Sequence, residues 1–176
     1  MKYYAFLRAI NVGGHTVKMA VLKQIFESLG FTDIETFLAS GNVGFETTST
    51  NVCELEKSIE DKLQGSLGFE VATFLRTYAE LNDIARFQPF SESAMKTAVS
   101  VNVAFLKEPL DTSDSKKVLA LDTPTDEFLV RGQEVYWLVR TRQSESSFSN
   151  AVLEKTLGKK STIRGIETIK KMVGES

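Results

Sequence analysis

The strongest constraint on the fold is an internal repeat that relates the two halves of the chain. Segment AFLR at 5–8 corresponds to AFLK at 104–107, FLASGNV at 37–43 to FLVRGQEV at 128–135, and LEKS at 55–58 to LEKT at 153–156. The three pairs occur in the same order, at spacings of 99, 91 and 98 residues. Because the two members of each pair fall on the same kind of predicted element, the sequence indicates a duplicated fold.

The apolar pattern of the first half predicts the order β-α-β-β-α-β. Strand-like runs cover 2–9, 33–39, 43–47 and 69–75, and helical spacing covers 17–30 and 51–68. The second half repeats this order with strands at 100–106, 127–130, 135–140 and 161–163, and helices at 113–121, 148–157 and 167–173. We therefore predict an α+β protein with two tandem ferredoxin-like halves, 1–77 and 99–176. A connecting helix and a loop at 78–98 join them, and a closing helix ends the second half.

This topology brings two glycine-bearing segments to one edge of the first sheet. RAINVGG at 8–14 follows the first strand, and SGN at 40–42 follows the second, which runs parallel to the first. The first helix begins at the same edge, and the amides of a helix start attract anions. The sequence therefore predicts a site for phosphate, a nucleotide or a carboxylate metabolite, formed by Arg8, Asn11, Gly13, Gly14, Lys18, Ser40, Gly41 and Asn42. The alternative is two ordinary turns, since tight turns favour the same residue types.

A second candidate group lies in TIRGIETIKK near the C-terminus. Thr162, Arg164 and Thr168 are expected around the opening of the last helix, where a guanidinium can bind a carboxylate or phosphate through two hydrogen bonds. Arg164 joins the first site if the two halves pack face to face. The alternative is a closing amphipathic helix that packs Ile166, Ile169 and Met172 inward.

The composition excludes several kinds of chemistry. One cysteine, Cys53, permits no internal disulfide, and together with a single histidine, His15, it argues against a zinc site or a Ser-His-Asp triad. The glycine spacing fits neither a P-loop nor a dinucleotide fingerprint. We therefore predict no metal and no cofactor, and the sequence leaves open whether the protein is an enzyme. Without a signal peptide or an apolar run of about 18 residues, we expect a cytoplasmic protein with no membrane partner.

Two other functions remain open at this point. A protein-interaction or assembly module is suggested by the lack of a nucleophile, a metal set or an acid–base pair. RNA binding is suggested by the topology, because RNA-recognition domains share it. However, the net charge is −2 and the third strand offers one aromatic residue, so nucleic acid is the less favoured partner. The oligomeric state is not specified.

The segment LRAINVGGHTVKMAVLKQIFESLGFTDIETFLASGNVGF at 7–45 resembles the start of a mainly bacterial family called domain of unknown function 1697. QPF, SSFSNAVLEKTLG and TIRGIETIKK fit the same family in order. The resemblance implies two ferredoxin-like halves and no particular reaction, and it supports both groups of candidate residues. The chain differs in having Ala9 where the family usually has glycine, and Gly165 and Ile166 where asparagine and tryptophan are common.

Overall fold

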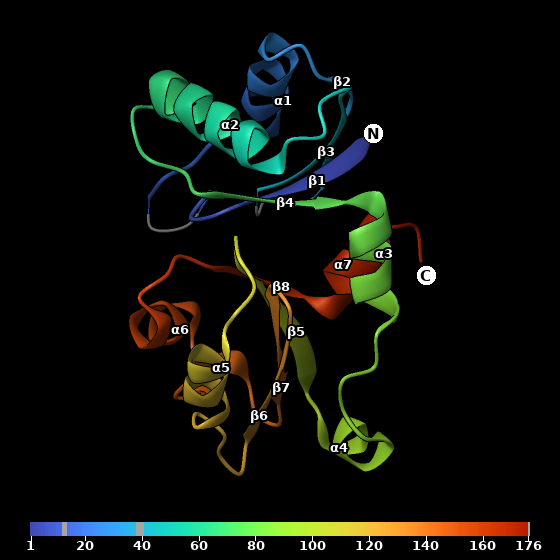
Figure 1. Cartoon of the computed structure of the whole chain (residues 1–176), viewed down its shortest axis with the longest axis vertical. Coiled ribbons are helices and arrows are strands. Elements are labelled where there is room, and N and C mark those ends of the chain that lie inside the picture. The colour runs from blue at the N-terminus through green and yellow to red at the C-terminus, as the bar shows by residue number, and fades with distance from the viewer. Residues whose placement is uncertain (12–13, 38–40, 176) are drawn as a thin grey trace. The chain divides into compact units, whose positions relative to one another are not determined.

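The computed structural model describes residues 1–11, 14–37 and 41–175, and its contacts divide the chain into two units. The units are Met1–Asn82 and Asp83–Ser176, and each is a mixed α+β structure built around one sheet (Figure 1). In the described part of the chain, no helix has the length and apolar character needed to cross a membrane.

The first unit contains one four-stranded sheet with two helices on one of its faces (Figure 1). Its elements are β1 (Lys2–Leu7), α1 (Met19–Ser28), β2 (Thr32–Phe37), β3 (Asn42–Glu46), α2 (Val52–Leu67) and β4 (Thr73–Thr77). The strands are ordered β2-β3-β1-β4, and every neighbouring pair is antiparallel. The expected parallel relation of β1 and β2, with β3 between them, follows from this order.

Local sequence signals explain the limits of the two helices. Val17 and Leu22 flank the start of α1 and are both buried in the core, as in a hydrophobic staple. Gly30 follows the end of α1 with a φ of 83°, the left-handed conformation that favours glycine after a helix. The side chain of Asn51 accepts a hydrogen bond from the amide of Glu54 and thereby caps the start of α2.

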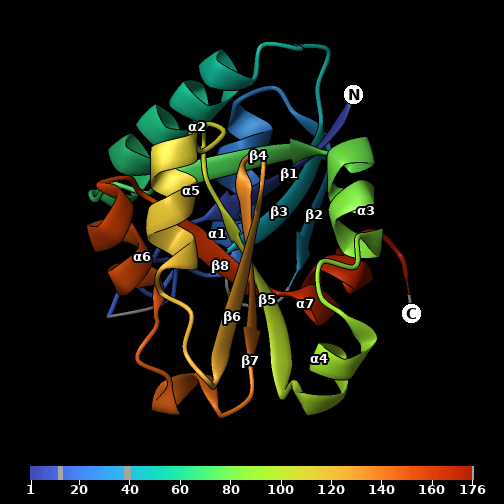
Figure 2. The same ribbon diagram turned by 60° about the horizontal axis from the view of Figure 1, so that its bottom comes forward.

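The second unit contains another four-stranded antiparallel sheet, ordered β6-β7-β5-β8. Helix α3 (Tyr78–Arg86) crosses the boundary between the units. The remaining elements are α4 (Glu92–Thr97), β5 (Ser100–Phe105), α5 (Thr112–Leu119), β6 (Asp126–Arg131), β7 (Glu134–Val139), a 3-10 turn (Gln143–Glu145), α6 (Asn150–Leu157), β8 (Thr162–Gly165) and α7 (Ile166–Met172). In Figure 2, α5 and α6 lie together on one side of these strands, whereas α4 and α7 lie on the other. The two sheets are consistent with a duplicated fold.

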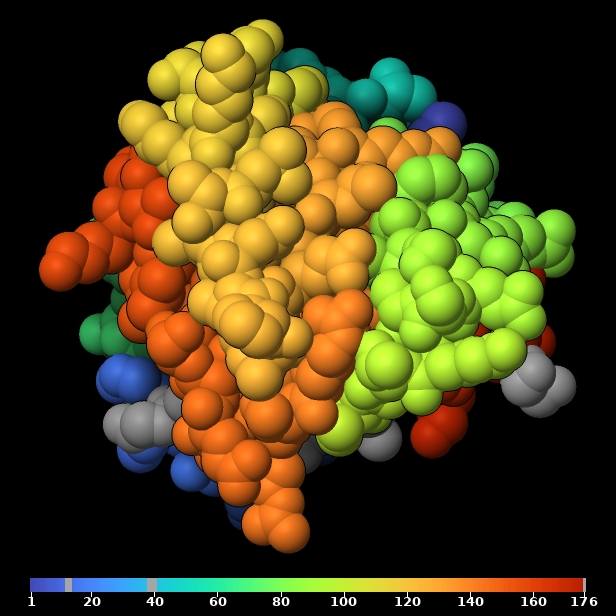
Figure 3. Space-filling view, turned by 90° about the horizontal axis from the view of Figure 1, so that it is seen from below, coloured from blue at the N-terminus to red at the C-terminus, as the bar shows by residue number. Residues whose placement is uncertain are grey.

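Helix α4 lies against the end of β7 in the second unit. Figure 3 shows the green residues of this segment beside the orange strands. The amide of Val99 donates to the carbonyl of Val139 at 2.8 Å, and Arg140 Nε donates to Thr97 Oγ1 at 2.7 Å. These bonds tie the chain after α4 to the sheet.

The repeated LEK segments have the same structural role in both halves. Glu56, in the first LEK, accepts a hydrogen bond from the backbone amide of Leu75 on β4. Glu154, in the second, accepts one from the amide of Ser161, directly before β8. Glu60 adds a bond from the amide of Thr73. Because β4 and β8 are edge strands, these carboxylates occupy amides that a further strand could otherwise bind.

The structure corrects three of the predicted elements. The fourth strand begins at Thr73 rather than Phe69, because Phe69 stacks on His15 at 4.0 Å between ring centroids, ahead of the strand. The predicted loop at 88–98 contains α4, whose start is capped by the hydroxyl of Ser91. The last strand extends to Gly165, and the closing helix follows it directly at Ile166, one residue earlier than expected.

Candidate functional site

The end of β1 is tied to two neighbouring segments by backbone hydrogen bonds. The amide of Leu7 donates to the carbonyl of Gly41 at 2.8 Å, and the amide of Arg8 donates to the carbonyl of Ala72 at 2.9 Å. The first bond joins the last residue of β1 to the second glycine-bearing segment. Within this unit, the structure therefore brings the end of β1 and the turn before β3 together, as the topology predicts.

Three residues after β1 have left-handed backbone conformations. The φ angles of Ala9, Asn11 and Gly14 are 62°, 59° and 90°. Asn11 closes the loop: its amide donates to the carbonyl of His15, and its Oδ1 accepts from the amide of Val17 at 2.7 Å. Because the Asn11 side chain organises the loop in this way, we assign it a structural role.

Gly41 and Asn42 also support the backbone. Gly41 has a φ of 77°, and a Cβ there would lie only 3.0 Å from the Cβ of Ile10 and 3.1 Å from that of Leu7. Asn42 is fully buried and donates from Nδ2 to the carbonyl of Phe37, which closes the hairpin of β2 and β3. These residues hold the two segments in close contact, and both are better described as scaffold than as ligand contacts.

The start of α1 differs from most helix starts in this chain. Lys18 occupies the N-cap position but makes no capping hydrogen bond, and the first turn contains no acidic residue. In contrast, Asn51, Ser91, Asp111 and Ser149 cap α2, α4, α5 and α6 through their side chains. The amides of the first turn of α1 therefore face no side-chain cap from the described residues, and a helix start of this kind favours an anion.

The N-terminal edge is defined here as Arg8, Asn11, Gly14, Lys18, Gly41 and Asn42. Two of these residues carry positive charge: Arg8 is half-buried at the end of β1, and Lys18 is exposed at the start of α1. The other two predicted members, Gly13 and Ser40, lie outside the described residues. The edge thus combines a backbone scaffold, an uncapped helix start and two cationic side chains.

The C-terminal candidates do not share one element. Thr162 and Arg164 lie on β8, and only Thr168 lies on α7, so the expectation that all three open the last helix is wrong. Arg164 Nη1 donates to Thr162 Oγ1 at 2.6 Å and to the carbonyl of Ile163 at 2.9 Å. Burial lowers the pKa of Arg164 to about 10, which still leaves its guanidinium protonated at neutral pH.

Sequence reasoning missed Arg76, which corresponds to Arg164 in the other half. Arg76 pairs with Tyr4 of β1, and Arg164 pairs with Val103 of β5. The two partners, Tyr4 and Val103, are 99 residues apart, which is one of the spacings that relate the halves. Arg76 Nη1 donates to the carbonyl of Leu75, as Arg164 Nη1 does to that of Ile163. The two arginines are 88 residues apart, outside the spacings of 91–99 that define the sequence repeat, and the fourth strand was expected to end at Leu75.

The described residues contain no candidate metal site. No group of three or more His, Cys, Asp or Glu side chains there could hold a metal ion. Cys53 is exposed near the start of α2.

Comparisons with known proteins identify a family and a fold. The family model described as "Protein of unknown function (DUF1697)" matches residues 1–136. That match covers the N-terminal edge and QPF at 88–90, but not the segments at 146–158 and 162–171. Among solved structures, the conserved bacterial protein SP0830 from Streptococcus pneumoniae is similar, with a TM-score of 0.77 and 21% identity over 98% of this chain and 96% of that one. A search among curated proteins finds no match.

Proposed function

The chain belongs to the DUF1697 family of proteins of unknown function, and we propose that it binds a small anionic ligand at the N-terminal edge. We further propose that both halves are ferredoxin-like, on the support of their equivalent strand orders, and that the protein acts in the cytoplasm. The expected ligand carries a phosphate or carboxylate group. No reaction is assigned to the site.

The observation that carries this proposal is the start of α1, which has no side-chain cap among the described residues and follows the loop after β1. The Leu7–Gly41 bond keeps the turn before β3 next to the end of β1, and the loop after β1 leads directly to Lys18. First-turn amides can donate to an anion, and the helix dipole adds about 0.3–1 kcal/mol to such an interaction.

The charged side chains and the scaffold have separate parts in this proposal. Arg8 supplies a planar guanidinium that can bind two oxygens of one anionic group, and Lys18 supplies a compact charge. Asn11, Gly41 and Asn42 hold the loop and the turn in place through the contacts described above. The candidates on β8 and α7 are treated as a separate group in the second unit.

The proposal is tested by calorimetric titration of inorganic phosphate, adenosine monophosphate and citrate at low salt. We expect at least one of them to bind, and Arg8→Ala or Lys18→Ala to weaken its binding about tenfold or more, because a hydrogen bond to a charged group contributes about 1.5–3 kcal/mol. Lys23→Ala is the matched control, since Lys23 is an exposed lysine further along α1. Equal affinities in all four proteins would show that the site is elsewhere.

The RNA-binding alternative is less well supported. Strand β3 has a single aromatic residue, Phe45, which lies in the core. Its ring stacks on those of Phe31 at 4.4 Å and Tyr3 at 5.8 Å between centroids. Base stacking instead needs aromatic side chains of β1 and β3 on the sheet face away from the helices. Retention on single-stranded RNA at low salt would reverse this preference.

Assembly through the addition of a strand from another molecule is disfavoured at β4, β6 and β8. Glu56 and Glu60 bind amides of β4, Glu154 binds the amide before β8, and Asp122 Oδ1 accepts from the amide of Phe128 on β6. Carboxylates in these positions oppose the addition of another strand at those edges. Light scattering that shows a stable oligomer would favour the assembly function.

A further inference from the structure

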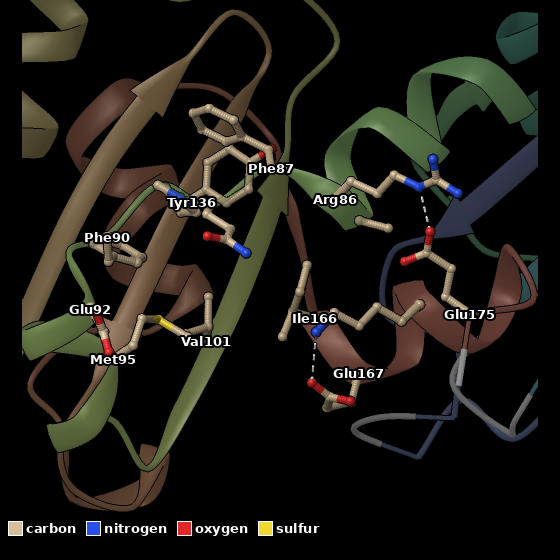
Figure 4. A pocket seen from close by; sticks show the side chains of 14 residues that line it. Arg86, Phe87, Phe90, Glu92, Met95, Val101, Tyr136, Ile166, Glu167 and Glu175 are labelled. Atoms are coloured by element: carbon tan, nitrogen blue, oxygen red, sulfur yellow. Dashed lines mark hydrogen bonds and ion pairs between the residues drawn. The ribbon is translucent and has the colours of Figure 1, made fainter.

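The C-terminal unit contains a hollow between α3, α4, α7 and the sheet. The hollow has a volume of about 660 Å³, within the range of about 300–1,000 Å³ usual for small-molecule sites. Figure 4 shows Phe90 and Met95 on one side of it and Ile166 with the Arg86–Glu175 pair on the other. We call it the α7 pocket, and its apolar lining consists of Phe87, Phe90, Met95, Val101, Tyr136 and Ile166.

Part of the wall of the α7 pocket is aromatic. The rings of Phe87 and Tyr136 lie 5.3 Å apart between centroids, at an angle of 60°. The guanidinium carbon of Arg131 lies 4.0 Å from the centroid of the Phe87 ring. Arg131 also forms an ion pair with Asp83 at 2.9 Å. These contacts fix the aromatic wall, whereas Met95 is flexible and 46% exposed at the mouth.

Charge on the rim disfavours an anionic ligand. The two cations in the lining each have a carboxylate partner: Arg86 pairs with Glu175, and Lys170 pairs with Glu167 at 3.4 Å. Glu92 adds a third carboxylate to the lining, and it pairs with Lys96 at 3.7 Å. An entering anion would therefore have to displace an existing ion pair, whereas a neutral molecule does not meet this cost.

One buried polar group of the pocket has no hydrogen-bond partner among the described residues. This is the hydroxyl of Tyr136, a residue with no exposed surface, on which the positive charge of Arg131 also acts. Burial raises the pKa of Tyr136 to about 12, so the hydroxyl remains protonated and can donate at neutral pH. A buried group that lacks a partner is costly, and a ligand with a polar substituent can supply the missing hydrogen bond.

From these observations we propose that the α7 pocket binds a neutral, planar aromatic molecule that carries one hydrogen-bonding group. Its ring system packs between Phe87, Phe90 and Ile166, and its polar group pairs with the hydroxyl of Tyr136. This site is independent of the anion site in the first unit, because it uses other residues and selects against charge. The adjoining hollow of about 380 Å³ shares Met95, Val101 and Ile166 and can receive a longer substituent.

The test is a fluorescence titration of the full chain with the neutral probe N-phenyl-1-naphthylamine. We expect saturable binding that is about fivefold weaker in Tyr136→Phe and at least about tenfold weaker in Met95→Glu, which places a charge at the mouth. Leu119→Glu is the matched control, because Leu119 is 45% exposed on α5 and does not line the pocket. The sulfonated analogue 1-anilinonaphthalene-8-sulfonate is expected to bind at least about tenfold more weakly than the neutral probe.

Several outcomes would overturn the proposal. These are an absence of saturable binding, an equal loss in the Met95 and Leu119 variants, unchanged affinity in Tyr136→Phe, or equal affinity for the sulfonated analogue. Circular dichroism checks that each variant is folded. Met95 and Leu119 are exposed enough that neither change is expected to prevent folding.

Discussion

Replacement of Ala9 by glycine is expected to stabilise the protein. Ala9 has a φ of 62°, a conformation that costs a residue with a Cβ about 1–2 kcal/mol. Glycine removes this strain but increases the conformational entropy of the unfolded chain, which opposes the gain by about 0.4–1 kcal/mol. The net expectation is an increase of about 0.5–1 kcal/mol in the free energy of unfolding.

Urea unfolding followed by circular dichroism measures this change, with Ala20→Gly as the control. Ala20 is exposed on α1, and glycine in a helix costs about 0.5–1 kcal/mol relative to alanine. The two substitutions should therefore shift the unfolding midpoint in opposite directions. If Ala9→Gly destabilises the protein as much as Ala20→Gly does, the left-handed conformation at Ala9 is not a source of strain.

Three further substitutions test other parts of the fold. Gly41→Ala should lower the free energy of unfolding by about 2–4 kcal/mol, because it combines a φ of 77° with a Cβ only 3.0 Å from Ile10; a loss below about 1 kcal/mol in urea unfolding would contradict this. Glu56→Ala should cost about 1–3 kcal/mol and speed hydrogen exchange at the Leu75 amide, whose acceptor it removes; unchanged exchange would refute the edge-protection role. Asp126 is buried, which opposes ionisation, but hydrogen bonds from Ser146, Trp137 and two threonines hold its pKa below the ordinary 3.8. The stabilising effect of the ionised Asp126 carboxylate is therefore complete above pH 3.8 and is lost as pH falls through the lower folded pKa. In Asp126→Asn, the free energy of unfolding should therefore depend less on pH in that acid range.

The repeat and the apolar periodicity are sufficient to predict most of the fold. They place the strands and helices of both halves in the observed order, because each half has to bury a strand face with period two and a helix stripe with period 3.6. They fail at Phe69 and Val71, which alternate like strand residues and are at least partly buried, yet precede the first ladder pairs of β4. They also miss α4, whose six residues are too few to give a helical period.

The candidate site was predictable in its location but not in the role of each residue. Strand order alone places the loop after β1 beside the turn before β3. Residue type does not distinguish an asparagine that binds a ligand from one that closes a loop, as Asn11 does, or a hairpin, as Asn42 does. The left-handed conformation of Ala9 is likewise invisible in the sequence, because alanine disfavours it.

The most direct test of anion binding at the N-terminal edge is a phosphate titration of the ¹⁵N-labelled chain, followed by amide chemical shifts. We expect the largest saturable shifts at Gly14, Lys18, Met19 and Ala20, and we expect them to disappear in Lys18→Ala but persist in Lys23→Ala. Shifts that occur only elsewhere in the chain, or that do not saturate, would contradict it.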